Sequence, residues 1–104
     1  MSSSNFSISY EVSAEVSEDL CDAFESFMIE RHIPDLMATG YFREAHFEKS
    51  APGRYRTRYE AVDRASLERY FEEHAARLRA HVAGLFPEGV RFGREEWETL
   101  ATFE

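Results

Sequence analysis

The spacing of apolar residues along this chain alternates between the two-residue period of a strand and the 3.6-residue period of a helix. From residue 6 to residue 15 the two-residue period is strict, with every second side chain apolar. The apolar members are Phe6, Ile8, Tyr10, Val12 and Ala14. This pattern predicts a strand with one face in the core and one face in water.

The next segment has helical spacing. Ser17 is a candidate N-cap, and acidic residues follow it where the helix dipole favours them. The apolar side chains that recur at helical intervals are Leu20, Phe24, Phe27 and Met28. Pro34 has no backbone N–H, so we expect the helix to break or kink there. A further turn can then run to Gly40 as the C-cap.

The second half of the chain repeats these periods. Residues 41–49 and 54–62 have strand character and flank the turn-forming sequence Ser-Ala-Pro-Gly, which predicts a hairpin. Asp63 can cap a second helix, which we expect to end around Gly84. Its apolar stripe consists of Leu67, Tyr70, Phe71, His74, Leu78, His81, Val82 and Leu85.

A last strand is predicted over residues 90–103. Its apolar positions are even-numbered up to Phe92 and mostly odd-numbered from Trp97 onward. Such a change of face suggests an irregularity between them, and Gly93 is the residue expected to form a bulge.

The predicted order is therefore βαββαβ, in the α+β class. It is the order of a ferredoxin-like sandwich, with both helices on one face of a four-stranded antiparallel sheet. A length of 104 residues has room for one domain, which we place at residues 6–104 after a disordered polar leader over residues 1–5.

Composition and motifs exclude several classes of function. Twenty acidic and 12 basic residues give a net charge of −8, which disfavours nucleic acid as a partner. No apolar segment is long enough to span a membrane, and the single cysteine, Cys21, is typical of a protein in a reducing cytoplasm. The dinucleotide, P-loop, α/β-hydrolase and zinc-protease motifs are missing, so we predict no cofactor and no metal.

Two stretches carry a family resemblance. Residues 32–42, with the run His-Ile-Pro-x-x-x-Ala-Thr-Gly-x-Phe, and residues 54–98 resemble small bacterial proteins grouped as domain of unknown function 4286. The resemblance covers nearly the whole chain. It implies a ferredoxin-like fold of the dimeric α/β-barrel type, and it implies no activity.

Candidate site residues occur first on the polar face of the predicted sheet. If the first and third strands pair centrally, this face brings together acidic, basic and imidazole side chains. The four that we select as candidate ligand-binding residues are Glu11, His46, Arg56 and Arg58. Either the face is solvated and carries surface ion pairs, or a second subunit encloses it and the arginines anchor a carboxylate or phosphate.

Two helix histidines are further candidates. His32 precedes Pro34, and His74 lies in the apolar stripe of the second helix. Each can act as an acid or base near neutral pH, or can serve only to hydrogen-bond neighbouring groups. Together with His81 they have no spacing that fixes a metal site.

These observations lead to one functional hypothesis and two alternatives. We expect a homodimer, because a single four-stranded sheet would leave one face bare and expose Trp97, Leu100 and Phe103. The expected function is binding of a small polar or anionic ligand in a barrel or cleft. The alternatives are a cofactor-independent enzyme, such as a monooxygenase or isomerase, suggested by fold analogy, and a protein–protein interaction module.

Overall fold

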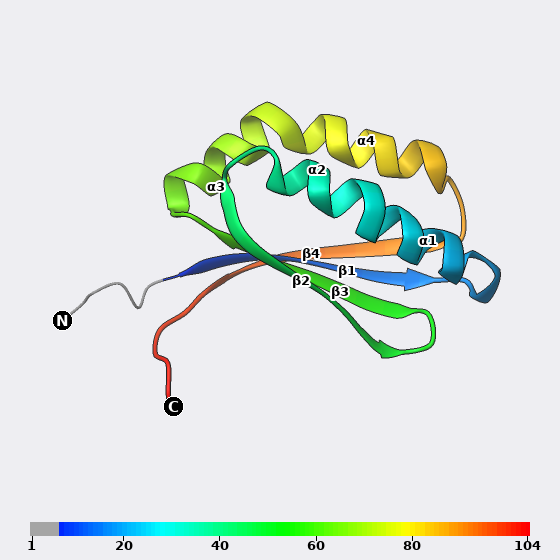
Figure 1. The fold of residues 1–104 in the computed structure, drawn as a ribbon, viewed down its shortest axis with the longest axis horizontal. Helices are drawn as coiled ribbons and strands as arrows, with labels where there is room; N and C mark the ends of the chain where they lie inside the picture. Colours follow the sequence, from blue (N-terminus) through cyan, green and yellow to red (C-terminus); the bar gives the residue numbers. More distant parts are fainter. Residues whose placement is uncertain (1–6) are drawn as a thin grey trace.

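The computed structural model describes residues 7–104 and consists of two layers. One layer is a four-stranded antiparallel sheet in the order β2-β3-β1-β4, and both helical runs cover the same face of it (Figure 1). The strands are β1 (Ile8–Val16), β2 (Phe42–Ala51), β3 (Arg54–Ala61) and β4 (Val90–Glu98). The predicted ferredoxin-like βαββαβ sandwich is confirmed. The predicted leader and Phe6 lie outside the described residues.

The first helical run extends from residue 18 to residue 37, so the predicted break at Pro34 does not occur, although the run changes from π-helical to α-helical geometry just before the proline. It comprises the 3₁₀ turn η1 (Glu18–Leu20), α1 (Cys21–Phe27), the π-helical turn η2 (Met28–His32) and α2 (Ile33–Met37). In the π turn before Pro34 the backbone N–H of Ile33 donates to the carbonyl of Met28, five residues back. A turn of this width accommodates the proline that follows it, because proline is tolerated in the first turn of the α-helix that begins at Ile33. Ser17 stands at the N-cap of η1, but its hydroxyl makes no capping bond. Gly40 follows α2 with a φ of 83°, as its predicted C-cap role requires.

The second helical run comprises α3 (Arg64–Tyr70), the π-helical turn η3 (Phe71–Ala75) and α4 (Ala76–Leu85). Asp63 caps it as predicted, because its carboxylate accepts a hydrogen bond of 2.7 Å from the backbone N–H of Ser66. The run ends at Leu85, where Phe86 leaves the helical region with a φ of −128°.

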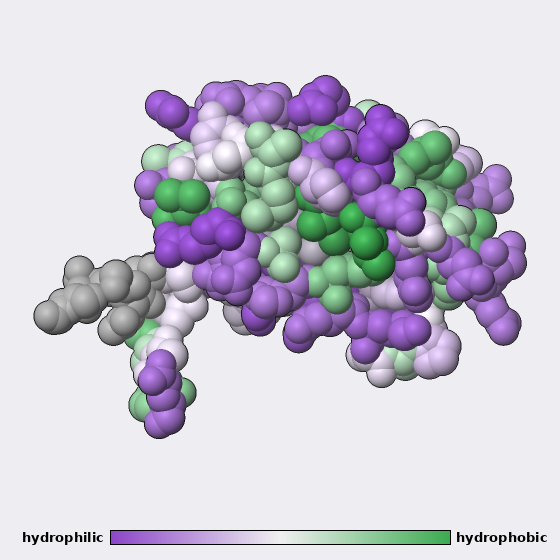
Figure 2. All heavy atoms as spheres, viewed as in Figure 1, coloured by the Kyte–Doolittle hydropathy of each residue, from purple (hydrophilic) through white to green (hydrophobic). Residues whose placement is uncertain are grey.

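Two apolar clusters fill the space between the layers. One is built around Tyr10, Tyr59 and Leu67, and the other is built around Phe24 and Tyr55. Figure 2 shows the layering from outside, because hydrophilic side chains line the outer surfaces and hydrophobic ones gather in the band between them. The two clusters together position the helices over the sheet.

Strand β4 differs from expectation in two respects. Gly93 forms no bulge, since β4 pairs with β1 in unbroken register and Gly93 lies opposite Ser13. A Cβ atom at Gly93 would approach the Ser13 hydroxyl to 2.7 Å, so the glycine leaves room for that side chain. The strand also ends at Glu98 and not at residue 103. Glu98 pairs with Ile8, the first residue of β1. The register shifts occur in β2 instead.

Candidate functional site

The sheet face turned away from the helices, here called the open face, collects most of the charged strand residues. Its charged and titratable members are Glu11, Glu15, Glu44, His46, Glu48, Arg54, Arg56, Arg58, Glu60, Arg91 and Glu95. Strand register places Arg58 between Glu11 of β1 and His46 of β2, and Arg56 opposite Glu48. The predicted placement of Glu11, His46, Arg56 and Arg58 on one face is therefore confirmed.

Ion pairs on the open face are mostly exposed. Arg56 donates from Nε and Nη2 to Glu48 Oε1 at 3.0 and 2.8 Å, and His46 Nε2 lies 2.7 Å from Glu44 Oε2. Exposed pairs of this kind contribute about 0–1 kcal/mol each. Arg58 differs, because its Nε is buried and has no hydrogen-bond partner within residues 7–104.

A second location, which we call the inner cavity, lies between the sheet and the helices. It has a volume of about 30 Å³. Its lining comes from both helical runs and from three strands, and consists of Tyr10, Val12, Met28, His32, Leu36, Tyr59, Tyr70, Arg79, Val82, Phe92 and Arg94. Among these lining residues there are two arginines and a histidine, but no aspartate or glutamate.

His32 is the predicted site residue that the structure places in the inner cavity. Its Nδ1 is buried and has no hydrogen-bond partner among the described residues, and its ring stacks on Phe27 with centroids 5.5 Å apart. Burial lowers the pKa of His32 to about 4 against the opposing effect of the Asp35 carboxylate, and the positive charges of His81 and Arg94 lower it further by smaller amounts. The imidazole is therefore neutral at pH 7.

The two cavity arginines are held by aromatic rings. Arg79 donates from Nη2 to the Tyr10 hydroxyl at 3.0 Å, and its guanidinium lies 5.9 Å from the ring centre of Phe71. Arg94 lies 5.4 Å from the ring centre of Phe92. Within residues 7–104 neither arginine forms an ion pair with a carboxylate. Both charges are thus available to a ligand.

Two tyrosines of the inner cavity keep their protons. Burial raises the pKa of Tyr59 and of Tyr70 well above the ordinary value of a phenol. At neutral pH both are hydroxyl groups that can donate or accept a hydrogen bond.

Sequence reasoning found His32 and missed both arginines. Arg79 adjoins Leu78 but does not belong to the apolar stripe, so its position alone gave no signal. A signal did exist for Arg94, because it shares the parity of Val90 and Phe92, whose side chains face the helices. A cation at that parity is a candidate for a site between the layers.

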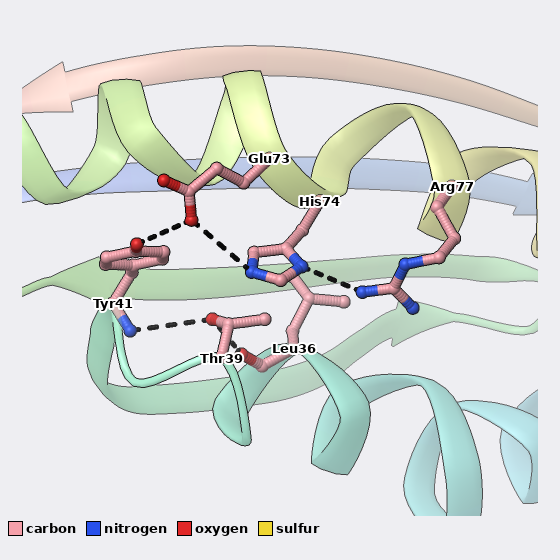
Figure 3. A network of polar contacts seen from close by, with 6 residues as sticks. All are labelled: Leu36, Thr39, Tyr41, Glu73, His74 and Arg77. Atoms are coloured by element: carbon pink, nitrogen blue, oxygen red, sulfur yellow. Dashed lines mark hydrogen bonds and ion pairs between the residues drawn. The ribbon is translucent and has the colours of Figure 1, made fainter.

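His74 belongs to a third location, a polar network between η3 and the α2–β2 connection (Figure 3). Arg77 donates to His74 Nδ1 at 2.8 Å, so the other nitrogen, Nε2, carries the proton and lies 3.8 Å from Glu73 Oε1. Tyr41 donates from its hydroxyl to the same Glu73 oxygen at 2.7 Å, and its backbone N–H donates to Thr39. The network joins the α2–β2 connection to η3. Its contacts give His74 a structural role, which is to hold these two segments together.

Residues 7–104 contain neither a cluster of metal ligands nor a helix of membrane-spanning character. No three histidine, cysteine, aspartate or glutamate side chains there are grouped to hold a metal ion. In the same part of the chain, no helix combines the length and apolar character needed to cross a bilayer.

The sheet order, the two helical runs on one face and the resulting two layers define a ferredoxin-like α+β protein. Within this class the chain belongs to the family described as domain of unknown function (DUF4286), which matches residues 7–100. The resemblance inferred from the sequence is thereby confirmed. Among curated proteins, none matches this chain.

Solved structures share the fold at low sequence identity. A protein of unknown function from Nitrosomonas europaea is 20% identical with a TM-score of 0.69, and the match covers 96% of this chain and 95% of that one. A protein from Mycobacterium tuberculosis is 18% identical with a TM-score of 0.60, over 94% and 96% of the two chains. A protein from an uncultured marine organism, described as a dimeric ferredoxin-like protein, is 13% identical with a TM-score of 0.54, over 94% and 98%.

Proposed function

We propose that this protein binds a small organic anion at the rim of the inner cavity, where the exposed residues Arg79 and Arg94 lie. One observation carries the proposal: the cavity lining contains Arg79, Arg94 and His32 and, among described residues, no carboxylate, although acidic residues outnumber basic ones 20 to 12 in the chain. An anion that leaves water needs opposite charge and hydrogen bonds to replace its hydration. The two guanidinium groups supply the charge, and the neutral imidazole can donate from Nδ1.

Binding is favoured over the alternative of a cofactor-independent enzyme. A general base works best when its pKa lies near the operating pH, whereas burial holds the pKa of His32 at about 4. The raised pKa of Tyr70 likewise disfavours proton release at pH 7. These groups are suited to hydrogen bonding. An interaction module, the other alternative, would not require a cavity between the layers.

Ligand-dependent thermal stability tests the proposed function. A panel of small carboxylates and phosphorylated compounds, each with a neutral amide or alcohol of similar shape, is mixed with the full chain. A ligand at about 100 times its Kd is expected to stabilise the native state by about 2.7 kcal/mol, and the neutral counterparts are not. Arg94→Gln is expected to lose this response. Arg91→Gln, on the same strand but on the open face, is the control and keeps it.

The proposed function is overturned if no member of the panel raises the melting temperature. It is equally overturned if neutral counterparts stabilise the chain as much as the anions do, or if Arg94→Gln responds like the wild type.

We further propose that a second copy of the chain covers the open face. Cationic and anionic side chains lie side by side there, so a two-fold axis can set arginines of one copy against glutamates of the other. The partly exposed Arg58 side chain, which forms no ion pair within residues 7–104, can then pair with a carboxylate across the interface. Trp97 is 52% exposed and Phe103 is 91% exposed, and the C-terminal segment turns toward the side of the sheet opposite the helices (Figure 1). A solved protein with this fold is described as dimeric, which supports the proposal.

Reversing one charge on the open face tests the dimer. Sedimentation of the wild type at micromolar concentration is expected to give twice the chain mass of 12.1 kDa. Arg58→Glu should weaken the dimer by about ten- to a hundredfold, because it sets like charges against one another at the interface. The control is Arg31→Glu, on the outer side of the first helical run, which should leave the mass unchanged. A wild-type mass near that of one chain would refute the dimer.

A further inference from the structure

The inner cavity adjoins a larger hollow at the β4 edge of the sheet. At about 30 Å³ the cavity itself has room for little more than a water molecule. A second hollow, here called the outer cleft, measures about 230 Å³ and is lined by Tyr10, Phe71, Arg79, Arg94, Glu95 and Glu96. Tyr10, Arg79 and Arg94 line both spaces. The two arginines therefore stand where a small buried compartment meets a larger accessible one.

Aromatic rings shape the outer cleft around these arginines. Tyr10 and Phe71 meet edge to face with ring centroids 5.1 Å apart, and the Arg79 guanidinium lies over the Phe71 ring. A guanidinium stacked on a ring keeps its in-plane N–H groups free for a carboxylate. The Tyr10 hydroxyl accepts one of those N–H groups at 3.0 Å and so fixes the orientation of the fork.

The size and charge of the outer cleft limit what it can hold. Its volume lies below the roughly 300–1,000 Å³ of sites for drug-sized ligands, so the cleft suits a single ring better than a fused system or a nucleotide. Glu95 and Glu96 line the cleft as well, and Glu96 Oε1 accepts a bond of 2.7 Å from Arg64. Acidic groups there disfavour a second negative charge on the ligand.

We propose that the ligand is a planar aromatic monocarboxylate, bound with its carboxylate between Arg79 and Arg94 and its ring in the outer cleft beside Phe71. This inference rests on the proposed function, since it names the class of anion that the same arginines recognise. The ring gains an aromatic contact in addition to apolar burial. Such a contact is worth about 0.5–1.5 kcal/mol, which corresponds to as much as about tenfold in affinity.

Titration calorimetry with four probes tests the ligand class. Benzoate, cyclohexanecarboxylate, benzamide and phthalate are titrated into the full chain at one ionic strength. Benzoate is expected to bind about tenfold more tightly than cyclohexanecarboxylate, which has the same charge but no aromatic ring. Benzamide lacks the charge and phthalate has a second one, so both should bind still more weakly.

Variants locate the ring and the carboxylate. Phe71→Leu is expected to bring benzoate and cyclohexanecarboxylate within about threefold of each other while both still bind. Phe86→Leu, an aromatic residue of the other apolar cluster, is the control and keeps the preference. If Phe71→Leu does not fold, Tyr10→Phe serves instead, because it keeps the ring and removes the hydroxyl that orients Arg79. It should weaken benzoate binding about fivefold to tenfold.

The outcomes separate the two proposals. Equal binding of benzoate and cyclohexanecarboxylate, or a preference for phthalate, would overturn the aromatic monocarboxylate and leave anion binding intact. An unchanged preference in Phe71→Leu would overturn the placement of the ring. If no carboxylate binds but a phosphorylated compound stabilises the chain through Arg94, the ligand class is wrong and the proposed function stands. If no anion binds at all, both fail.

Discussion

Replacing Phe24 with alanine is expected to destabilise the fold by about 3–5 kcal/mol, the cost typical of removing a fully buried aromatic side chain. Phe24 is 1% exposed and belongs to α1. Its ring contacts rings from three strands and from the end of the second helical run, with centroid distances of 5.3 to 6.3 Å. These neighbours are Phe47, Tyr55, Phe86 and Phe92. The cavity left by alanine cannot be closed by one neighbour moving alone.

Urea unfolding at a fixed protein concentration measures this cost, since a dimer would make apparent stability concentration-dependent. Ile29→Ala is the matched control, because Ile29 lies in the same helical run but is 60% exposed, and it should change stability by less than about 1 kcal/mol. A loss below about 1 kcal/mol in Phe24→Ala would show that this aromatic cluster is not a closed core.

The strand and helix order was predictable because periodicity follows directly from which side chains face the core. Strict alternation in β1 determined its core face, and the same parity rule placed Glu11 and Arg58 together on the open face. Asp63 was also predictable, since an N-cap depends on a hydrogen bond three residues away and not on distant packing.

Features that depend on backbone detail were not predictable from the sequence pattern. The π turn η2 lets the helix pass Pro34, yet a single wider turn hardly changes the spacing of apolar residues. In β4 the move of apolar residues to odd positions suggested a bulge at Gly93. The strand instead stays in register, and Trp97 simply lies on the open face.

The candidate site was predictable only in part for a related reason. His32 stood out in the sequence because a histidine can act as an acid or base near neutral pH. Nothing in the sequence showed that its Nδ1 would be buried without a hydrogen-bond partner among the described residues. The arginines that share its cavity are 47 and 62 positions further along the chain, at Arg79 and Arg94, so only the fold brings them near His32.

The acid side of the stability profile is expected to depend on His32. Folding holds the pKa of His32 at about 4, against about 6.5 for an ordinary histidine, so between these values the unfolded chain binds a proton that the native state does not. Stability must therefore fall as pH drops through this range. The groups that act on the imidazole are Asp35, His81 and Arg94, and Arg79 lines the same cavity.

His32→Leu removes the titrating group and keeps an apolar side chain of useful size in the cavity. Relative to this variant, the wild type is expected to lose about 2 kcal/mol of stability between pH 7 and pH 4.5, as the two pKa values require. The many carboxylates of the chain also titrate near pH 4.5, but they are common to both proteins and cancel in the comparison.

Met28→Leu provides the matched control, because Met28 lines the same cavity and carries no titrating group. Its urea-unfolding profile across pH 7 to pH 4.5 should run parallel to that of the wild type, while the profile of His32→Leu should be flatter. Parallel profiles for all three proteins would mean that His32 takes up its proton equally well in the folded and unfolded chain. The imidazole would then be in free contact with bulk water. The cavity would not be desolvated, and the proposal that it favours an anion through Arg79 and Arg94 would lose its physical basis.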